Sequence, residues 1–282
     1  MKIALCISGL ARCFEETYIN QRNNLIEPND CDIFLYTSDF VSEKHSQDNP
    51  YKGKKFLKYS DLIIGDVAKR KNKNHIIGTA YNLDSKKLEE KIISVYGDRV
   101  KKIHIEKETL EENYSAGWDD ADRLTGKNWF STGKNWAWTK KMFEKTYKCN
   151  KMFMKYCKEN NKKYDFVIRS RMDLTFKKEI NIKNFEPANN NVYAFGGWNP
   201  SGTLEKIGYK EYFFDGFAVA KPEDMEKYCN FWEQESEIAG KPQGMEPQLH
   251  HYLESVGLKY KSIGNTKKKT QKLYVINRLK NK

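Results

Sequence analysis

Three charged side chains at alternate positions are the residues of this sequence best suited to chemistry. Arg169, Arg171 and Asp173 occupy every second position in the stretch 164–176, YDFVIRSRMDLTF. On an extended chain this spacing puts two guanidinium groups and one carboxylate on the same side. Arginines bind phosphate oxygens in a forked geometry, and an aspartate can hold a divalent cation that bridges a diphosphate. The pattern indicates a site for a phosphorylated ligand, with a purely structural Arg–Asp network as the alternative.

The residues before this charged group predict the strand that would carry it. Phe166, Val167 and Ile168 are apolar and favour β-structure, as an inner strand covered on both faces requires. In open α/β sheets ligands bind at the carboxyl ends of the strands, and residues 169–173 would lie at such an end. The stretch therefore predicts both a core strand and a ligand site at its tip.

A second candidate site follows the first strand. Residues 2–7 predict a buried strand, and Ser8, Gly9 and Arg12 lie in the turn that leads into a helix expected at about 14–25. A turn of small residues with a basic side chain, placed before a helix N-terminus, suits a phosphate or a base. The turn matches neither GxGxxG nor a Walker loop, so a plain strand–helix connection stays open as the alternative.

The remaining elements alternate between strands and helices, which is typical of an α/β sheet. Further strands are expected at 32–37, 100–105, 192–195, 212–220 and 258–263, and helices at 84–96, 133–160, 222–238 and 246–256. The polar stretch 38–82 predicts an irregular excursion over the sheet or a lid. No composition break divides the chain, so we expect one domain over residues 1–265 and a basic tail over 266–282, as an edge strand or a mobile arm.

Carboxylates at two other places are candidates for acid–base chemistry. Asp215 and Gly216 interrupt the apolar run 212–220, which indicates a bulge or the close approach of a ligand. Glu246 precedes Pro247 at the start of the last helix, so it is either a cap stabilised by the helix N-terminus or a general base. Both acids are therefore candidates, each with a structural alternative.

Besides Asp173, the sequence offers few ligands for a metal ion. Asp120 and Asp122 form a DxD that could hold a metal, but no apolar strand leads into it, and Asp residues before a helix are often caps. We therefore rank this pair below Asp173. His250 and His251 are adjacent and point in different directions, so at most one of them serves a site.

Composition bounds the classes of protein and partner. Among 282 residues, Lys and Arg (50) exceed Asp and Glu (38), and the net charge of +12 favours anionic partners. The lysines are scattered and no nucleic-acid motif accompanies them, so we expect a solvated basic surface and no nucleic acid. Six cysteines without CxxC pairs predict free, buried thiols. Without a signal peptide or a run of about 18 apolar residues, we expect a cytoplasmic protein with no transmembrane segment, and contact with an anionic membrane stays open.

Taken in order, these motifs resemble those of GT-A-fold nucleotide-sugar glycosyltransferases, in particular the small enzymes of capsular, lipopolysaccharide and large-virus glycan synthesis. KIALCISGLAR resembles their first strand and nucleotide-binding turn, and YDFVIRSRMDLTF is similar to a YDxVIRxRxDL signature at the place of a metal-binding DxD. DGFAVAKPEDM resembles the next strand and helix, on the acceptor side. GMEPQLHHYLESVGLKY is similar to the helix that carries the base of inverting members. The resemblance covers most of the chain and implies a GT-A-like, Rossmann-type α/β fold.

The resemblance also implies which residues bind the donor. Ser8, Gly9 and Arg12 would bind the nucleotide of a nucleoside-diphosphate sugar, and Arg169 and Arg171 would bind its diphosphate. Arg171 stands where a standard DxD has its first aspartate. Its guanidinium could supply part of the positive charge that a cation would otherwise provide.

For catalysis, the resemblance implies two residues that hold one metal ion and two carboxylates that act on the acceptor. Asp173, with His250, would hold Mn²⁺ or Mg²⁺. Glu246 would act as the base of an inverting transfer of a hexosyl or pentosyl group, and Asp215 would orient the glycan acceptor. Glu246 is followed by Pro247, which leaves one carboxylate where many members have two, and this keeps Asp215 in contention as the base.

Two other classes of protein fit parts of the sequence. A nucleotidyltransferase acting on sugar phosphates would share the α/β sheet and the metal aspartate, but would need a stronger phosphate loop than SGLAR. A non-catalytic carbohydrate-binding protein would account for the aromatic residues and the basic surface. The expected location is the cytoplasm, or the host cytoplasm if the chain is viral.

Overall fold

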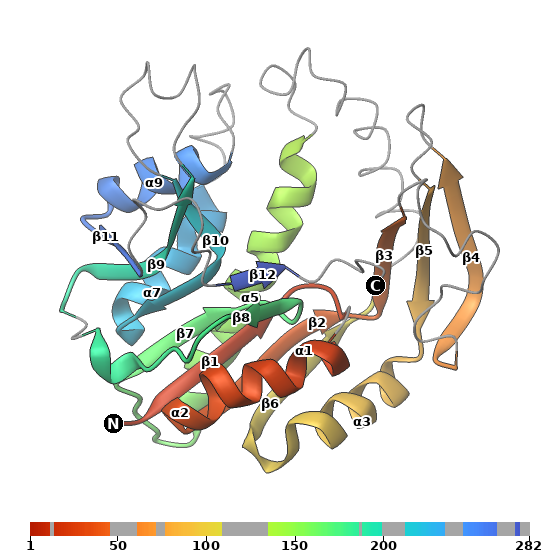
Figure 1. Ribbon diagram of the computed structural model, residues 1–282, viewed down its shortest axis with the longest axis horizontal. Helices are drawn as coiled ribbons and strands as arrows, with labels where there is room; N and C mark the ends of the chain where they lie inside the picture. The colour runs from red at the N-terminus through yellow and green to blue at the C-terminus, as the bar shows by residue number, and fades with distance from the viewer. Residues whose placement is uncertain are drawn as a thin grey trace.

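A seven-stranded sheet forms the centre of the protein, as the computed structural model shows (Figure 1). The structure describes residues 1–11, 14–45, 61–71, 77–108, 135–185, 188–198, 212–234, 245–263 and 274–276. The strands lie in the order β11–β9–β10–β7–β1–β2–β6. Their bounds are β1 Ile3–Ser8, β2 Cys31–Ser38, β6 Val100–Glu106, β7 Phe166–Ser170, β9 Asn191–Trp198, β10 Tyr212–Ala220 and β11 Lys259–Ser262.

The central strands of this sheet are parallel. β1 pairs in parallel with β2 and β7, and β6 pairs in parallel with β2. β10 is antiparallel to both β7 and β9, and β11 is parallel to β9. The predicted Rossmann-type α/β architecture, with a mixed and mostly parallel sheet, is therefore confirmed.

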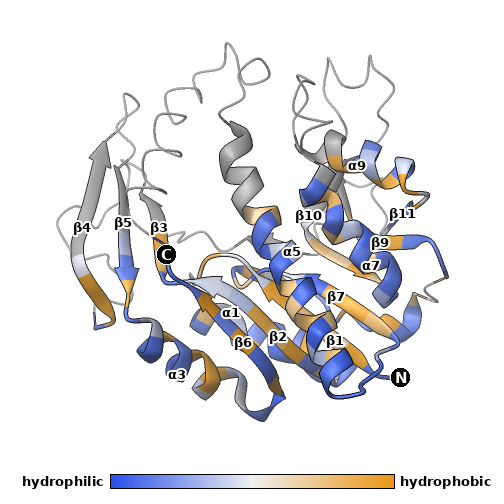
Figure 2. Cartoon of the chain, turned by 180° about the vertical axis from the view of Figure 1, so that it is seen from behind, coloured by the Kyte–Doolittle hydropathy of each residue, from blue (hydrophilic) through white to orange (hydrophobic). Residues whose placement is uncertain are grey.

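Helices cover both faces of the sheet (Figures 1 and 2). One face carries the helices between β1 and β6, and the other, seen in front in Figure 2, carries the long helix before β7 and the helices of the C-terminal half. The first face has α1 Phe14–Gln21, a π-helical turn Arg22–Ile26, α2 Glu27–Asn29 and α3 Ser85–Tyr96. The second has α5 Asn135–Glu159, α7 Pro222–Cys229 and α9 Met245–Ser255.

The alternation of side chains along β1 separates two hydrophobic layers. Ile3, Leu5 and Ile7 pack in the core under α1 and α3, whereas Ala4 and Cys6 pack in the core under α5. This is the period of two that a buried strand imposes. The two residues that face α5 are small, and this helix contacts both β1 and β2.

Local signals fix several helix ends as the sequence predicts. The Asp84 carboxylate accepts hydrogen bonds from the N–H groups of Lys86 and Lys87, at 3.0 and 3.1 Å, and so caps α3. Gly97, with φ of +67°, ends it. α7 begins at Pro222 but is shorter than expected, because it gives way to a 3-10 helix at Asn230–Gln234.

The expectation of irregular chain over residues 38–82 is wrong for the described part of this stretch. A three-stranded antiparallel sheet in the order β3–β5–β4 stands beside the main sheet (Figure 1). Val41 near the start of β3 and Tyr81 and Leu83 near the end of β5 pack into the core. The sequence of the stretch is polar and lacks the strict alternation of apolar and polar residues that marks a half-buried strand. The strands are β3 Phe40–His45, β4 Ile63–Lys71 and β5 Ile77–Leu83.

The cysteines behave as the sequence predicts. The five in the described part of the chain, Cys6, Cys31, Cys149, Cys157 and Cys229, are all free. Burial raises the pKa of the Cys6 and Cys229 thiols well above the ordinary value. They therefore stay protonated and act as small apolar side chains.

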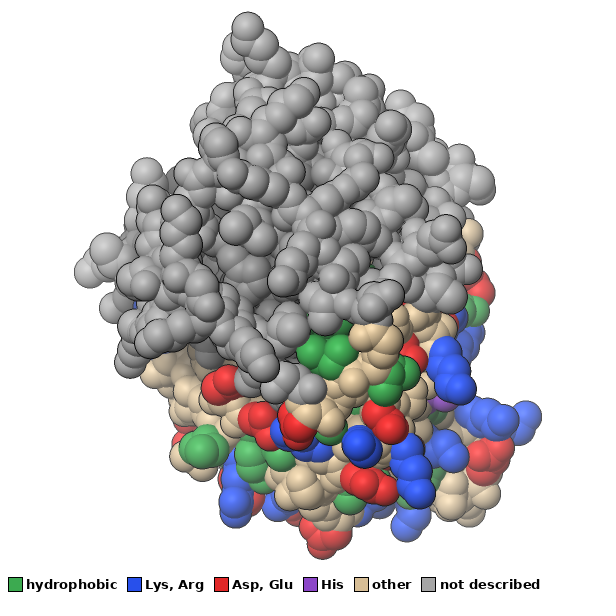
Figure 3. All heavy atoms as spheres, turned by 90° about the vertical axis from the view of Figure 1, so that its right-hand side faces the viewer, with side chains coloured by type: hydrophobic (Ala, Val, Ile, Leu, Met, Phe, Trp, Pro, Cys, Tyr) green, Lys and Arg blue, Asp and Glu red, His purple; other side chains and the backbone are tan. Residues whose placement is uncertain are grey.

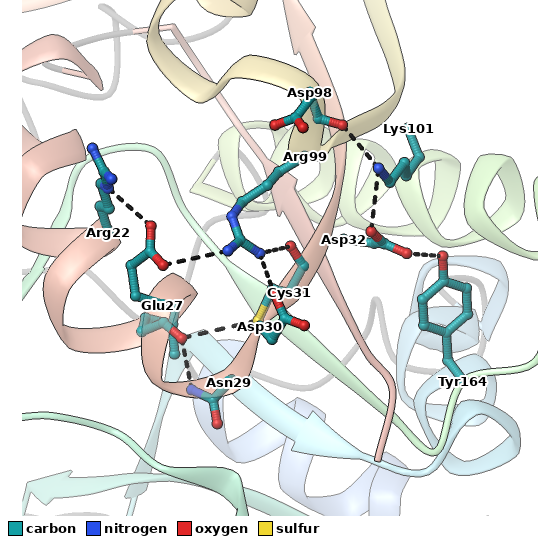
Figure 4. Close-up of polar contacts among 11 residues, drawn as sticks. Arg22, Glu27, Asn29, Asp30, Cys31, Asp32, Asp98, Arg99, Lys101 and Tyr164 are labelled. Carbon is teal, nitrogen blue, oxygen red and sulfur yellow. Dashed lines mark hydrogen bonds and ion pairs between the residues drawn. The ribbon is translucent and has the colours of Figure 1, made fainter.

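An ion-pair network joins the elements at the amino ends of the parallel strands (Figure 4). Arg99, just before β6, pairs with Asp30 at 2.8 Å and with Glu27 at 3.3 Å. Lys101 pairs with Asp32 at 3.4 Å. Such partly exposed pairs each contribute about 0–1 kcal/mol to stability. They lie at the edge of the sheet opposite to the one where ligands are expected.

Positive and negative side chains are interspersed on the face that Figure 3 shows. There, Lys and Arg side chains lie among Asp and Glu side chains in the described region. This mixture agrees with the prediction of a solvated surface on that face. Across the described residues, none of the helices is sufficiently long and apolar to pass through a membrane.

Candidate functional site

The strand order reverses between β1 and β7, and this point defines the candidate site. From β1 the chain continues to β2 and then to β6 on one side, and α5 carries it back to β7 on the other side of β1. In open α/β sheets a crevice forms outside the carboxyl ends of the strands where the order reverses, and ligands bind there. The residues that end β1 and β7 are therefore the first candidates.

The structure brings together the two candidate sites that the sequence predicts separately. Ser8 and Gly9 end β1, and Arg169 and Arg171 lie at the end of β7. In the parallel register of the two strands, Ile7 pairs with Ser170, and Ser8 and Arg171 are the residues that follow these partners along the chain. These four residues therefore share one edge of the sheet, while Arg12 lies outside the described residues.

Gly9 turns the chain out of β1 and leaves its backbone open on one side. Its φ of +127° lies in the region that favours glycine, and a Cβ there would meet nothing within 4 Å. On the other side, the Thr37 Oγ1 donates to the Gly9 carbonyl oxygen at 2.7 Å, and the Gly9 N–H donates to the Tyr36 carbonyl oxygen at 3.3 Å. The turn is thus fixed against β2 while a ligand could approach the backbone.

Arg169 is a buried cation in the layer between β7 and α5. Only 1% of its surface is exposed. Its Nη2 donates to the Thr146 Oγ1 at 3.3 Å, and its guanidinium lies over the Phe143 ring at 5.9 Å. Among the described residues, its Nε and Nη1 have no hydrogen-bond partner, and no carboxylate forms an ion pair with it. Burying such a charge is costly unless a ligand or a partner compensates it.

Thr146 connects this cation to the turn after β1. Its hydroxyl lies 3.1 Å from the Ser8 Oγ, and it also donates to the Met142 carbonyl oxygen at 3.1 Å. The sequence places Thr146 in the apolar stripe of a long helix, and a polar residue in such a stripe was the available signal. Near the same cluster, burial raises the pKa of Cys229, and the positive charge of Arg169 only partly offsets this effect.

Arg171 and Asp173 form a bidentate ion pair just beyond the end of β7. The Arg171 Nε lies 2.8 Å from the Asp173 Oδ1, and its Nη2 lies 2.7 Å from the Oδ2. The side chains are 12% and 3% exposed. The Arg171 Nη1 also lies 4.0 Å from the Met142 Sδ on α5. Arg169 and Arg171 therefore reach the same stretch of α5, as their alternate spacing predicts.

The backbone around this ion pair is held by a side chain from α1. The Gln21 Nε2 lies within hydrogen-bonding distance of the carbonyl oxygens of Arg171, Met172 and Leu174, at 3.0, 3.2 and 2.9 Å. Gln21 is fully buried. One amide therefore fixes the turn that carries Arg171 and Asp173.

Further amides on the same helical stretch hold the chain that follows. Asn20 donates to the Phe176 carbonyl oxygen at 3.0 Å and accepts from the Phe176 N–H at 2.6 Å. Asn29 donates to the Ile180 carbonyl oxygen at 2.6 Å, and the Asn24 carbonyl oxygen accepts from the Ile180 N–H at 2.7 Å. These bonds explain why a helix of low intrinsic propensity is rich in Asn.

The opposite side of this segment pairs with the C-terminal part of the chain. β8, Leu174–Phe176, is antiparallel to β12, Tyr274–Ile276, and Ile276 pairs with Leu174 directly after Asp173. The stretch after the ion pair is therefore held between α1 and β12. The structure shows residues 274–276 as a strand, one of the two alternatives left open for the tail.

We expect Gln21→Leu to lower the free energy of unfolding by about 2 kcal/mol. The change removes the amide donor from the carbonyl oxygens of Arg171 and Leu174, while the Met172 oxygen keeps the Thr17 hydroxyl as a donor. Loss of a hydrogen-bond partner by a buried polar group costs about 1–3 kcal/mol. Urea unfolding followed by circular dichroism measures it. Arg22→Gln, at the next and exposed position, is the matched control and should change stability by less than about 0.5 kcal/mol. Equal stability of Gln21→Leu and wild type would show that these bonds do not hold the turn.

The two candidate catalytic acids lie on β10, which pairs with β7, and on α9, which contacts β10 and β11. Asp215 lies in β10, between Phe213 and Ala218, where the pairing with β9 shifts its register, as a bulge or another irregularity of the strand would do. Glu246 is the second residue of α9. Because β9 and β11 run in the same direction as β7, the helix that leads into β11 begins on the carboxyl side of the sheet. The positions of both side chains lie outside the described part of the structure, so both catalytic roles stay predictions.

The described residues do not form a donor set for a metal ion. No group of three or more His, Cys, Asp or Glu side chains suitable for a metal occurs among them. Both oxygens of Asp173 accept from Arg171, and the His250 Nε2 lies 3.3 Å from a Glu254 oxygen. The DxD at residues 120–122 lies outside the described residues. As described, Asp173 and His250 do not fit the role of a metal pair.

Comparison with known proteins finds similar solved structures only. No family model and no curated protein matches the chain. Among solved structures it is similar to the galactosyltransferase LgtC in complex with donor and acceptor sugar analogs, at 11% identity and a TM-score of 0.43, over 92% of this chain and 73% of that chain. An active-site mutant of LgtC is also similar, at 12% and 0.42, over 92% and 72%. At these values the matches do not establish what this chain binds or transfers.

Proposed function

We propose that this protein is a glycosyltransferase that moves a sugar from a nucleoside-diphosphate sugar to a hydroxyl group of a glycan acceptor. The observation that carries the proposal is the presence of Arg169 and Arg171 at the edge where the strand order reverses. Guanidinium groups favour phosphate oxygens as ligands, and such an edge favours a nucleotide. The resemblance of the sequence motifs to those of nucleotide-sugar enzymes indicates that the nucleotide carries a sugar and that a glycan accepts it.

In this proposal the donor lies across the ends of β1 and β7. The nucleotide rests on the open side of Gly9, next to Ser8, and the diphosphate extends toward Arg169 and Arg171. The positive charge of the arginines stabilises the negative charge that develops on the diphosphate as it leaves. Electrostatic stabilisation of this kind usually lowers the activation barrier more than any other single effect in an enzyme.

The transfer itself needs a base on the acceptor side. Glu246, at the start of α9, takes the proton of the acceptor hydroxyl as its oxygen bonds to the anomeric carbon of the donor sugar. The bond between that carbon and the diphosphate oxygen breaks, and the nucleoside diphosphate leaves with the bonding electrons. Attack from the opposite side inverts the anomeric centre. Asp215, where the pairing of β10 with β9 shifts its register, orients the acceptor.

A panel of nucleotide sugars tests this function. We expect one of them to raise the thermal unfolding temperature of the full chain and to release a nucleoside diphosphate when an acceptor or water is present. Release of pyrophosphate from a nucleoside triphosphate and a sugar phosphate would identify a nucleotidyltransferase instead. A protein that binds glycans but no nucleotide would be a carbohydrate-binding protein without this activity.

A further inference from the structure

We infer that the donor diphosphate is stabilised here by the two arginines in the place of a divalent metal ion, so that donor binding is independent of metal. This inference rests on the proposed function and concerns how the same site works. It replaces the expectation that Asp173 is a metal ligand. Three features of the described residues support it: the ion pair of Asp173 with Arg171, the positive sign of the local charge, and the buried charge of Arg169, which pairs with none of the described carboxylates.

The first feature is the partner that Asp173 already has. Both of its oxygens accept from the Arg171 guanidinium, at 2.8 and 2.7 Å, in the parallel geometry that matches these two groups best. The carboxylate is 3% exposed. A cation could bind Asp173 only by displacing a guanidinium from a buried pair. Asp173 is therefore better described as the residue that orients Arg171.

The second feature is the sign of the charge. Arg169 and Arg171 carry two positive charges, and Asp173 carries one negative charge, so these three side chains together are positive. A divalent cation next to two guanidinium groups is repelled, whereas a diphosphate is attracted.

The third feature is the uncompensated charge of Arg169. It is 99% buried, and among the described residues its Nε and Nη1 have no hydrogen-bond partner and no carboxylate pairs with it. An anion at the end of β7 would supply the missing negative charge. The hydroxyls of Thr146 and Ser8 connect Arg169 to the turn at Gly9, where the backbone is open. The cation thus lies beside the place where the diphosphate is expected.

Titration calorimetry of the full chain with UDP and with GDP, in EDTA and in Mn²⁺, tests the inference. We expect the Kd of the nucleotide that binds to differ by less than about threefold between the two conditions, which is a small difference in binding free energy. Binding that appears only with Mn²⁺, or that tightens more than about tenfold with it, would overturn the inference and leave the proposed function standing. Absence of binding in both conditions would overturn both.

Two arginine variants test whether the nucleotide binds at Arg171. We expect Arg171→Gln to weaken nucleotide binding in EDTA by roughly 10-fold to 100-fold, the range that a charge-assisted hydrogen bond covers. Arg99→Gln is the matched control, because Arg99 also pairs with carboxylates but lies at the opposite edge of the sheet (Figure 4). Its Kd should equal that of wild type. Unchanged binding by Arg171→Gln would contradict the inference.

A double variant covers the case in which Arg171→Gln does not fold because it leaves Asp173 buried without its cation. Arg171→Gln with Asp173→Asn replaces the ion pair by two neutral side chains of similar shape that can still bond to each other. Circular dichroism should show a folded protein, and nucleotide binding should still be weakened by roughly 10-fold or more. A folded double variant with wild-type affinity would overturn the inference.

Discussion

Replacing Arg169 with methionine is expected to abolish most of the activity without destabilising the protein. In the proposed function the guanidinium stabilises the leaving diphosphate, and loss of one such group lowers kcat by about 10²-fold to 10³-fold. In the free protein the same group is a buried charge that pairs with none of the described carboxylates. An apolar side chain of similar length removes the cost of burying that charge, so the free energy of unfolding should stay equal or rise by on the order of 1 kcal/mol.

This opposition between activity and stability separates a functional arginine from a structural one. Steady-state rates of nucleoside-diphosphate release and urea unfolding, measured on the same preparation, give both quantities. Arg169→Lys keeps the positive charge but loses the planar guanidinium that can donate two parallel hydrogen bonds. Its turnover rate should lie between those of wild type and Arg169→Met. A large loss of stability in Arg169→Met together with normal turnover would mean that Arg169 only holds α5 on the sheet.

Replacing Glu246 with glutamine is expected to lower kcat by roughly 10²-fold or more, because a positioned general base contributes about that much. The nucleotide should still bind with wild-type affinity, since the base acts on the acceptor. Release of nucleoside diphosphate from the preferred donor, with and without acceptor, measures the first effect, and calorimetry measures the second.

A matched control exists on another helix. Glu223 follows Pro222 in the first turn of α7, just as Glu246 precedes Pro247 in the first turn of α9. β10 runs against β7, so α7 begins at the amino edge of the sheet, away from the site. Glu223→Gln therefore loses the same interaction with a helix N-terminus, worth about 0.3–1 kcal/mol, but should keep full activity. Equal activity of both variants would show that Glu246 is a cap, and Asp215 would then be the next candidate.

Continuous apolar runs and local caps predict the centre of the fold. The runs at residues 3–7 and 166–168 predict strands that are covered on both faces, and Asp84 and Gly97 mark the ends of α3 through local hydrogen bonds. The arrangement of these strands follows from the α/β alternation. The sequence predicts Ser8 and Arg169 as two separate sites at strand ends, and the neighbourhood of β1 and β7 in the sheet brings them together.

Contacts between distant segments could not be predicted in this way. Thr146 bonds to a residue 138 positions away in the sequence, and Gln21 bonds to residues 150 to 153 positions away. A polar residue in an apolar stripe can be noticed in a single sequence, but its distant partner cannot be identified there. The three-stranded sheet could not be predicted because its sequence is polar and lacks the strict alternation of a half-buried strand. The spacing of Arg171 and Asp173 indicates one shared side, but it does not say whether the acid pairs with the arginine or with a metal.

The position of a bound nucleoside diphosphate is the most direct test of the account. A crystal structure of the full chain with UDP or GDP, grown without divalent metal, should show the diphosphate at the carboxyl ends of β1 and β7. An oxygen of the diphosphate should lie at hydrogen-bonding distance, about 2.7–3.2 Å, from a guanidinium nitrogen of Arg169 or Arg171. A diphosphate bound at another edge, with Arg169 still buried and without an anionic partner, would contradict the account.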